Sequence, residues 1–270
     1  MPPKKDKLTA TSLQDKKTRG EKIVVVTAYD VAFARLAERA GVDVVLVGDS
    51  LGMVVQGMSS TLPVTLDEMT YHCRMVARGV DRAHLVADLP FLSYQASLEE
   101  GIRAAGRLLK EGAAEAVKLE GGEEVAELIH RLTTMGIPVM GHVGMTPQSV
   151  HKFGGFKVQG RTEEQARSIV ADARAVAEAG AYAMVLEAIP ASLAAEITAA
   201  VPAATIGIGA GAACDGQVLV MHDLLGLDTE WSPRFARRYA ELGKATQEAF
   251  ACFADDVRAG RFPSEKESFK

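Results

Sequence analysis

The sequence contains few cysteines, only three in 270 residues. Cys73, Cys214 and Cys252 lie far apart and form no Cys-x-x-Cys pair, so their spacing predicts neither a disulfide framework nor a zinc site. Isolated cysteines of this kind are usually small buried hydrophobic residues or inert thiols. The pattern favours a protein of the reducing cytoplasm.

The chain also lacks an excess of basic residues. It has 30 Lys and Arg against 35 Asp and Glu, a formal net charge of −5, and its basic residues are scattered, which argues against a nucleic-acid partner. The lysines of residues 4–17 precede no apolar segment of the kind found in signal peptides. The apolar run 42–47 is too short to span a bilayer and contains Asp43, so we expect a soluble protein without a membrane partner.

Short apolar runs are plentiful, and helical patterns separate most of them. Their continuous Val, Ile and Leu content is typical of strands covered on both faces, and the alternation indicates a parallel sheet. The predicted strands span residues 23–26, 44–47, 85–87, 116–119, 138–140, 183–186, 205–208 and 218–221. Eight such units predict an α/β fold, a closed (β/α)8 TIM barrel, with an open doubly wound sheet as the alternative.

The segments between these runs carry apolar residues at helical spacing and end near glycine, as helices often do. The predicted helices span residues 32–40, 66–77, 98–109, 125–135 and 163–179. Residues 210–217 are too few for a full helix, so we expect an abbreviated crossover between the last two strands. A length of 270 residues suits a single domain over residues 1–270.

The N-terminal segment predicts a short capping helix. Ser12 followed by Asp15 is a candidate helix start, and this helix is expected to close the bottom of the barrel. Residues 1–8 are expected to form a disordered tail.

The C-terminal segment predicts a long helix over residues 232–260, because Ser232 and Pro233 form a favourable N-cap and N1 pair. The helix is expected to run to about Arg258. Its apolar side chains either pack against its own barrel or contact another subunit. These side chains are Phe235, Tyr239, Leu242, Phe250, Phe253 and Val257.

Polar or ionisable residues follow most of the predicted strands, at the end where β/α barrels carry their active sites. Lys118 and Glu120 are two residues apart on a strand, so both point to the same face. A single acidic residue here is more often a helix N-cap or a solvated charge, but several that converge predict an acidic site. The set is Asp49, Ser50, Asp88, Lys118, Glu120, His142 and Glu187.

An acidic site of this kind predicts a bound cation. Carboxylates packed together disfavour one another's charged form unless a cation neutralises them, and a set of oxygen ligands suits Mg²⁺ better than zinc. We therefore expect a hard divalent ion. Neutralisation by Lys118 without any metal is the alternative.

Seven segments resemble ketopantoate hydroxymethyltransferase, in order and without a missing block. They are TAYD at 27–30, VGDSLGMVVQG at 47–57, VADLPF at 86–91, VKLEGG at 117–122, GHVGMTPQSVHKFGGFKVQGR at 141–161, LEAIP at 186–190 and IGIGAGAACDGQVLVMHDLLGL at 206–227. Strings of this length are far more specific than a short fingerprint. The resemblance covers roughly residues 9–262.

The resemblance implies an enzyme of the phosphoenolpyruvate/pyruvate barrel superfamily. It would make 2-dehydropantoate from 3-methyl-2-oxobutanoate, with 5,10-methylenetetrahydrofolate as co-substrate, in the first step of pantothenate biosynthesis. The resemblance also implies a Mg²⁺ site made of Asp49, Asp88 and Glu120. The residues implied to contact the oxo acid are Asp49, Ser50, Asp88 and Lys118.

Two further residues gain catalytic roles from the resemblance. Glu187 matches the proton acceptor, and His142 matches a histidine that lines the site. His142 either donates a hydrogen bond to the enolate oxygen or positions the substrate. Relatives are homo-oligomers, commonly decamers, so a homodecamer is the implied assembly.

Two loops are long for a barrel, residues 51–65 and 143–162, and either is a candidate lid. A static loop packed on the rim is the alternative for the first. In the second, Lys152, Lys157 and Arg161 are candidates to meet the glutamate tail of the folate. Neither loop contains GxxxxGK[ST], which argues against nucleotide binding.

Two other functions compete with this prediction. The nearer one is another metal-dependent 2-oxo acid lyase or mutase of the same superfamily, which an assay with methylenetetrahydrofolate separates. The other is a barrel kept as a binding or scaffold protein, and the complete set of acidic strand ends argues against it.

Overall fold

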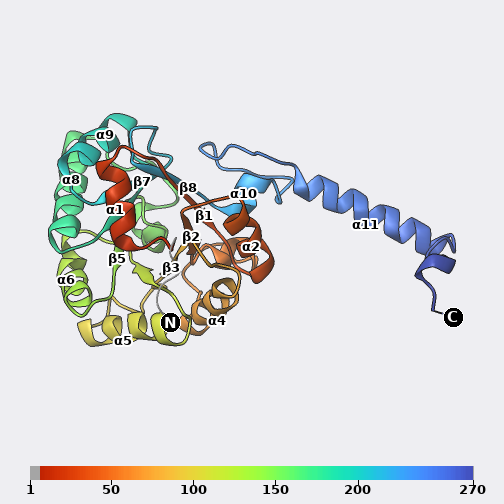
Figure 1. Cartoon of the computed structure of the whole chain (residues 1–270). Helices are drawn as coiled ribbons and strands as arrows, with labels where there is room; N and C mark the ends of the chain where they lie inside the picture. Colours follow the sequence, from red (N-terminus) through yellow and green to blue (C-terminus); the bar gives the residue numbers. More distant parts are fainter. Residues whose placement is uncertain (1–6, 270) are drawn as a thin grey trace. The chain divides into compact units, whose positions relative to one another are not determined.

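The computed structural model describes residues 7–269 and divides into two compact units, one ending at Val220 and one beginning at Met221. In the first unit eight parallel strands close into a barrel in chain order, with helices arranged around them (Figure 1). This confirms the predicted barrel and excludes the open sheet. The strands are β1 Ile23–Thr27, β2 Val44–Val47, β3 His84–Asp88, β4 Ala116–Lys118, β5 Val139–Gly144, β6 Ala183–Glu187, β7 Ala204–Ile208 and β8 Gly216–Leu219.

The last strand lies slightly earlier in the chain than predicted. β8 begins at Gly216 rather than at residue 218, and Met221 already belongs to a helix. Gly216 pairs with Ile23 of β1, where an added Cβ would collide with the Ile23 carbonyl oxygen. A small residue is therefore needed where the barrel closes, and this requirement is invisible in an apolar run.

Six helices cover the outside of the barrel, and amphipathic sequence explains most of them. They are α2 Val31–Arg39, α4 Leu66–Ala77, α5 Leu98–Lys110, α6 Ala126–Thr134, α8 Glu163–Glu178 and α9 Ala191–Ala200. Thr65 and Thr162 begin α4 and α8 with capping boxes, which satisfy the first backbone N–H groups of each helix. The structure adds α9, which the sequence analysis did not predict because its alanine-rich segment has only a weak polar face.

Shorter elements lie in the loops at the carboxyl ends of the strands. They are α3 Leu51–Val54, η1 Glu123–Val125, η2 Pro147–Ser149 and α7 Val150–Phe153. The segment between β7 and β8 holds no helix in the described chain, which confirms the abbreviated crossover.

The N-terminal helix α1, Ala10–Thr18, closes the bottom of the barrel as predicted. Leu13 is 1% exposed and joins the core cluster of inward-facing strand residues. The predicted cap was wrong, because Thr9 is the N-cap and forms a capping box with Ser12. Of the predicted disordered tail, residues 1–6 lie outside the described residues. The prediction was wrong for Lys7 and Leu8, which bond the carbonyl oxygens of Ala83 and Arg82 at 2.6 and 2.8 Å.

The second unit contains α10 Met221–Leu225, α11 Leu242–Arg258 and η3 Glu265–Glu267. The predicted C-terminal helix ends where expected but begins ten residues late, since its N-cap is Glu241. Arg238 explains the difference: its guanidinium donates to the carbonyl oxygens of Asp228 and Trp231 at 2.9 and 3.1 Å, which folds the preceding segment into a loop.

No residue of α11 is buried, and Phe250 and Phe253 are 70% and 55% exposed. Contact of this helix with another subunit therefore stays a prediction, as does a single domain over residues 1–270. None of the described helices is long and apolar enough to cross a membrane.

Candidate active site

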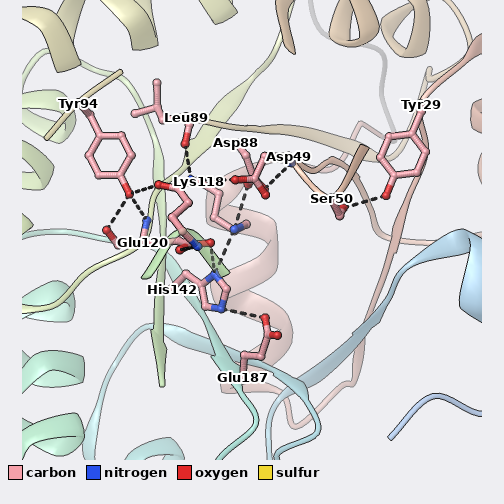
Figure 2. Close-up of polar contacts among 11 residues, drawn as sticks. Tyr29, Asp49, Ser50, Asp88, Leu89, Tyr94, Lys118, Glu120, His142 and Glu187 are labelled. Carbon is pink, nitrogen blue, oxygen red and sulfur yellow. Dashed lines mark hydrogen bonds and ion pairs between the residues drawn. The ribbon is translucent and has the colours of Figure 1, made fainter. Parts of the chain in front are cut away.

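The predicted strand-end residues gather at the carboxyl end of the barrel, brought there by five strands, β2 to β6 (Figure 2). Asp49 follows β2, Asp88 ends β3 and Lys118 ends β4. Parallel strands in register place these ends at one edge, and Asp88 pairs directly with Lys118. The predicted site residues that are at most 6% exposed are Asp49, Asp88, Lys118, Glu120 and His142.

Lys118 is the cation at the centre of this group. Its Nζ lies 3.0 Å from Asp88 Oδ1 and 3.2 Å from His142 Nδ1. The other oxygen of Asp88, Oδ2, accepts a hydrogen bond from the Asp49 backbone N–H at 3.1 Å. Asp88 thus links the ends of β2 and β4 through one carboxylate.

The electrostatics of this group are unbalanced toward negative charge. Burial, with the nearby charges of Asp88 and Glu120, raises the pKa of Asp49 well above its usual value. Burial also raises the pKa of Asp88, although Lys118 opposes the shift. Burial lowers the pKa of Lys118, but the surrounding carboxylates outweigh it and raise that pKa overall. One lysine therefore does not neutralise the cluster.

His142 lies between two glutamates. Its Nε2 is 3.1 Å from Glu187 Oε2, and its Nδ1 is 3.5 Å from Glu120 Oε1. Burial and Lys118 lower the pKa of His142, but Glu120 and Glu187 outweigh them, so that the pKa is raised overall to about 9. A neutral ring fits the distances with Lys118 donating to Nδ1. A charged ring fits them as ion pairs with Glu120 and Glu187.

Glu187 ends β6 and is more exposed than the five buried residues of the group, with 16% of its side chain accessible. The next residue, Ala188, has a φ of +45°, a strained conformation for a residue with a Cβ. Backbone hydrogen bonds hold this turn, because Met145 N–H donates to Glu187 O and Gln159 N–H donates to Ala188 O, both at 2.9 Å. The orientation of the Glu187 backbone is therefore fixed by its surroundings.

Ser50 lies at the edge of the cluster. Its hydroxyl is 2.9 Å from the hydroxyl of Tyr29, which follows β1. Desolvation of Tyr29 raises the pKa of its hydroxyl, so Tyr29 keeps its proton and can donate to Ser50. Tyr29 was not among the predicted site residues, although it lies in the TAYD string.

Two more buried residues belong to the cluster and were missed from the sequence. The Tyr94 hydroxyl accepts from Glu120 N–H at 3.1 Å and lies 2.9 Å from Gln148 Oε1. Gln148 Nε2 donates to Asp49 Oδ2 at 2.8 Å. Both residues stand away from strand ends, so only their place within or beside the long matching strings marked them.

A cavity of about 460 Å³ opens beside this cluster. Glu120, His142 and Gln148 line one part of it, and Lys152 and Asp172 line another. A separate hollow of about 540 Å³ is lined mainly by the apolar segments 62–66 and 90–93 and includes none of the predicted site residues. Of these two cavities, only the first is lined by predicted site residues.

The residues of the cluster determine which kind of metal ion this site can hold. Among residues 7–269, no three His, Cys, Asp or Glu side chains lie close enough together to enclose a metal by themselves. Buried Asp88 Oδ1 has no well-aligned hydrogen bond, only the ion pair with Lys118. Mg²⁺ needs one or two direct carboxylates, with waters or substrate oxygens completing its shell, so the site fits this ion and not a fully protein-enclosed one.

Comparison with known proteins agrees with this geometry. The chain is 58% identical over 261 residues to 3-methyl-2-oxobutanoate hydroxymethyltransferase of Syntrophotalea carbinolica, covering 97% of this chain and 98% of that protein. It is 56% identical over 266 residues to the enzyme of the same name from Moorella thermoacetica, covering 98% and 99%.

Solved structures share the fold at much lower identity. A phosphonopyruvate hydrolase aligns with a TM-score of 0.62 and 15% identity over 96% of this chain and 93% of that one. A 2,3-dimethylmalate lyase aligns with a TM-score of 0.61 and 17% identity over 97% and 89%. The family model for ketopantoate hydroxymethyltransferase matches residues 7–265, so the chain belongs to the ketopantoate hydroxymethyltransferase family.

Proposed function

We propose that this enzyme transfers a hydroxymethyl group from 5,10-methylenetetrahydrofolate to 3-methyl-2-oxobutanoate and so makes 2-dehydropantoate, the first step of pantothenate biosynthesis. The observation that carries the proposal is Glu187, a partly exposed carboxylate that faces the buried Lys118 and carboxylate cluster across His142. A base beside a site for an oxo acid is what removal of a proton next to a ketone requires.

The alternative, a metal-dependent lyase or mutase acting on another 2-oxo acid, is not favoured. Relatives that share more than half of their residues with this chain carry the hydroxymethyltransferase name. The mutases and lyases among the similar structures are only 16–18% identical and share the fold alone.

We propose that Asp49, Asp88 and Glu120 hold Mg²⁺, directly or through water. Three buried carboxylates against one buried lysine support a dication at this place. A solved phosphonopyruvate hydrolase of similar fold holds oxalate and Mg²⁺. When bound, Mg²⁺ would act as a Lewis acid on the keto oxygen of the substrate and make the neighbouring C–H more acidic.

The chain's own residues then bind and orient the oxo acid. Lys118 Nζ pairs with the substrate carboxylate, and the Ser50 hydroxyl, held by Tyr29, donates a hydrogen bond to it. Asp49 and Asp88 border the same position. Fixing the substrate in this way presents its C3 proton to the base and reduces the entropic part of the barrier.

Glu187 takes the C3 proton, and His142 keeps Glu187 in position. Both ring nitrogens of His142 already have partners, Nε2 toward Glu187 and Nδ1 toward Lys118 and Glu120. This favours a positioning role for His142 over donation to the enolate oxygen. The carbanion formed at C3 then attacks the methylene carbon, which the folate presents as an iminium after one of its two C–N bonds opens. Water cleaves the remaining C–N bond and releases the hydroxymethyl product and tetrahydrofolate.

The cavity beside Glu120 and His142 is the proposed place for the folate. Lys152 lines it and supports the suggestion that basic residues of this loop meet the glutamate tail, while Lys157 and Arg161 lie outside its lining. The loop of residues 143–162 is also the better candidate for a lid, since it borders the cavity.

Turnover of 3-methyl-2-oxobutanoate with methylenetetrahydrofolate tests the proposed function. Product is expected in the presence of Mg²⁺, and none after the metal is removed with EDTA, with activity restored when Mg²⁺ is added back. Full activity in rigorously metal-free protein would contradict the metal assignment. Absence of product with Mg²⁺ present, together with turnover of another 2-oxo acid, would favour the lyase or mutase alternative.

We further propose a cytoplasmic homo-oligomer, the decamer that the resemblance implies. Cys73 and Cys214 are buried free thiols, which supports a reducing compartment. The exposed apolar side chains of α11, such as Phe250 and Phe253, support a contact between subunits. Light scattering on the purified protein gives the subunit number, and a monomer at micromolar concentration would contradict the assembly.

A further inference from the structure

We propose that Gln148 is a positioning residue that holds the carboxylates of Asp49 and Glu120 in the orientation that binds metal and substrate. Gln148 lies in η2, in the loop after β5, and is only 7% exposed. The inference rests on the proposed function, because it concerns how the proposed metal-holding carboxylates are fixed.

The side-chain amide of Gln148 uses its full hydrogen-bonding capacity. Nε2 donates to Asp49 Oδ2 at 2.8 Å and to the Leu89 carbonyl oxygen at 2.9 Å. Oε1 lies 3.0 Å from Gln95 Nε2 and 2.9 Å from the Tyr94 hydroxyl, which also reaches the Glu120 carbonyl oxygen. The Leu89 carbonyl oxygen can only accept, so the amide orientation that places Nε2 toward Leu89 and Asp49 is the one that fits these contacts.

The backbone of Gln148 holds the second carboxylate, since its N–H donates to Glu120 Oε2 at 2.9 Å. One residue thus binds one oxygen of Asp49 and one oxygen of Glu120. Asp49 keeps its other oxygen, Oδ1, for a ligand, whereas Glu120 Oε1 also lies 3.5 Å from His142 Nδ1. The two rotamers are thereby fixed relative to each other before any ligand arrives, which is the usual effect of partners around metal ligands.

A neutral donor suits this place better than a cation. Hydrogen bonds from an amide stabilise buried carboxylates without adding charge. A lysine at position 148 would also neutralise Asp49, but its charge would repel a divalent ion bound a few ångströms away. Lys118 already supplies the one positive charge that the substrate carboxylate needs. The choice of an amide therefore leaves the negative potential of the cluster available for a metal.

The test is a titration of the purified enzyme with Mn²⁺, followed by electron paramagnetic resonance in the absence of substrate. Gln148→Met keeps the length of the side chain and the backbone N–H but removes every side-chain hydrogen bond. We expect its Mn²⁺ affinity to fall by about 10–100-fold, with kcat reduced as well. The matched control is Gln56→Met. It removes the 2.7 Å hydrogen bond from the Gln56 side-chain amide to the Glu68 carboxylate, which lies outside the cluster, and this variant should bind Mn²⁺ like wild type.

A folded Gln148→Met enzyme with wild-type Mn²⁺ affinity, kcat and KM would overturn the inference. If circular dichroism shows that this variant does not fold, Gln148→Asn replaces it: the amide remains but is one methylene too short to reach Asp49, and the same loss of affinity is expected. Wild-type affinity in Gln148→Asn would likewise overturn the inference. Failure of the wild-type enzyme to bind Mn²⁺ would refute the proposed metal site first, before any variant is compared.

Discussion

The two ends of the barrel differ in how their acidic residues are paired with lysines. At the amino ends of the strands, three acidic residues each pair with a lysine: Glu115 with Lys7 at 2.9 Å, Asp43 with Lys16 at 3.1 Å, and Asp215 with Lys17 at 2.9 Å. At the carboxyl ends, Lys118 is the one buried lysine among residues 7–269, and it lies in a cluster of buried carboxylates. The first arrangement is balanced, and the second is not.

The balance is visible in the protonation of single groups. Burial raises the pKa of Glu115, but hydrogen bonds from His84, Leu85 N–H and Lys7 outweigh it, so that pKa is lowered overall. Burial and neighbouring carboxylates raise the pKa of Asp49 instead. The difference teaches that the bottom of the barrel is arranged for stability, whereas the top retains an electrostatic cost that a ligand relieves.

The sharpest test of this division is Glu187→Gln, compared with Glu115→Gln at the bottom. Glu187→Gln removes the proposed base and should slow exchange of the C3 hydrogen by about 10²–10⁴-fold, while metal binding persists. Exchange of 3-methyl-2-oxobutanoate in deuterated water, followed by NMR, measures it. Glu115→Gln should exchange at the wild-type rate. Undiminished exchange in Glu187→Gln would remove Glu187 from its role.

The second test compares two Asp→Asn changes for their effect on stability. Asp215→Asn breaks the ion pair with Lys17 and should lower the free energy of unfolding by about 1–3 kcal/mol without a loss of turnover. Asp49→Asn relieves repulsion within the cluster, so the metal-free protein should be equally stable or about 1 kcal/mol more stable, although turnover falls. Urea unfolding without metal gives both values.

If Asp49→Asn destabilised the metal-free protein as much as Asp215→Asn, the two ends would not differ as described. Circular dichroism of both variants in buffer without urea serves as the control that each begins from a native fold.

The smallest expected effect is the pH dependence of stability. The raised folded pKa values of Asp49 and Asp88 mean that the folded state binds more protons, so the top gains stability as pH falls from neutral toward 3.8. The lowered pKa of Glu115 gives the opposite sign: its contribution is present above 4.5 and is lost as pH falls through the folded value.

Thermal unfolding of the metal-free protein between pH 7 and pH 4 measures the sum of these terms. Asp49→Asn should reduce the gain on mild acidification, and Glu115→Gln should reduce the loss below 4.5. An unchanged profile in both variants would show that neither group titrates as its surroundings indicate.

Much of this enzyme could be predicted from local sequence. The strands were found because continuous apolar runs between helical patterns are specific to buried parallel strands. Asp49, Asp88 and Lys118 were found because they directly follow or end such runs. The predicted start of the C-terminal helix was wrong. The Ser232 and Pro233 pair favours a helix locally, but the hydrogen bonds of Arg238 hold this segment in a loop.

The sequence by itself determined the eight barrel units, the polar strand ends and the family, because each is written in contiguous residues. Only the tertiary structure decided how those strand ends are held. Gln148 bonds Asp49 across 99 positions of the chain, and Tyr94 reaches Glu120 across 26. Contacts between residues so far apart arise from barrel closure, and no local pattern encodes them.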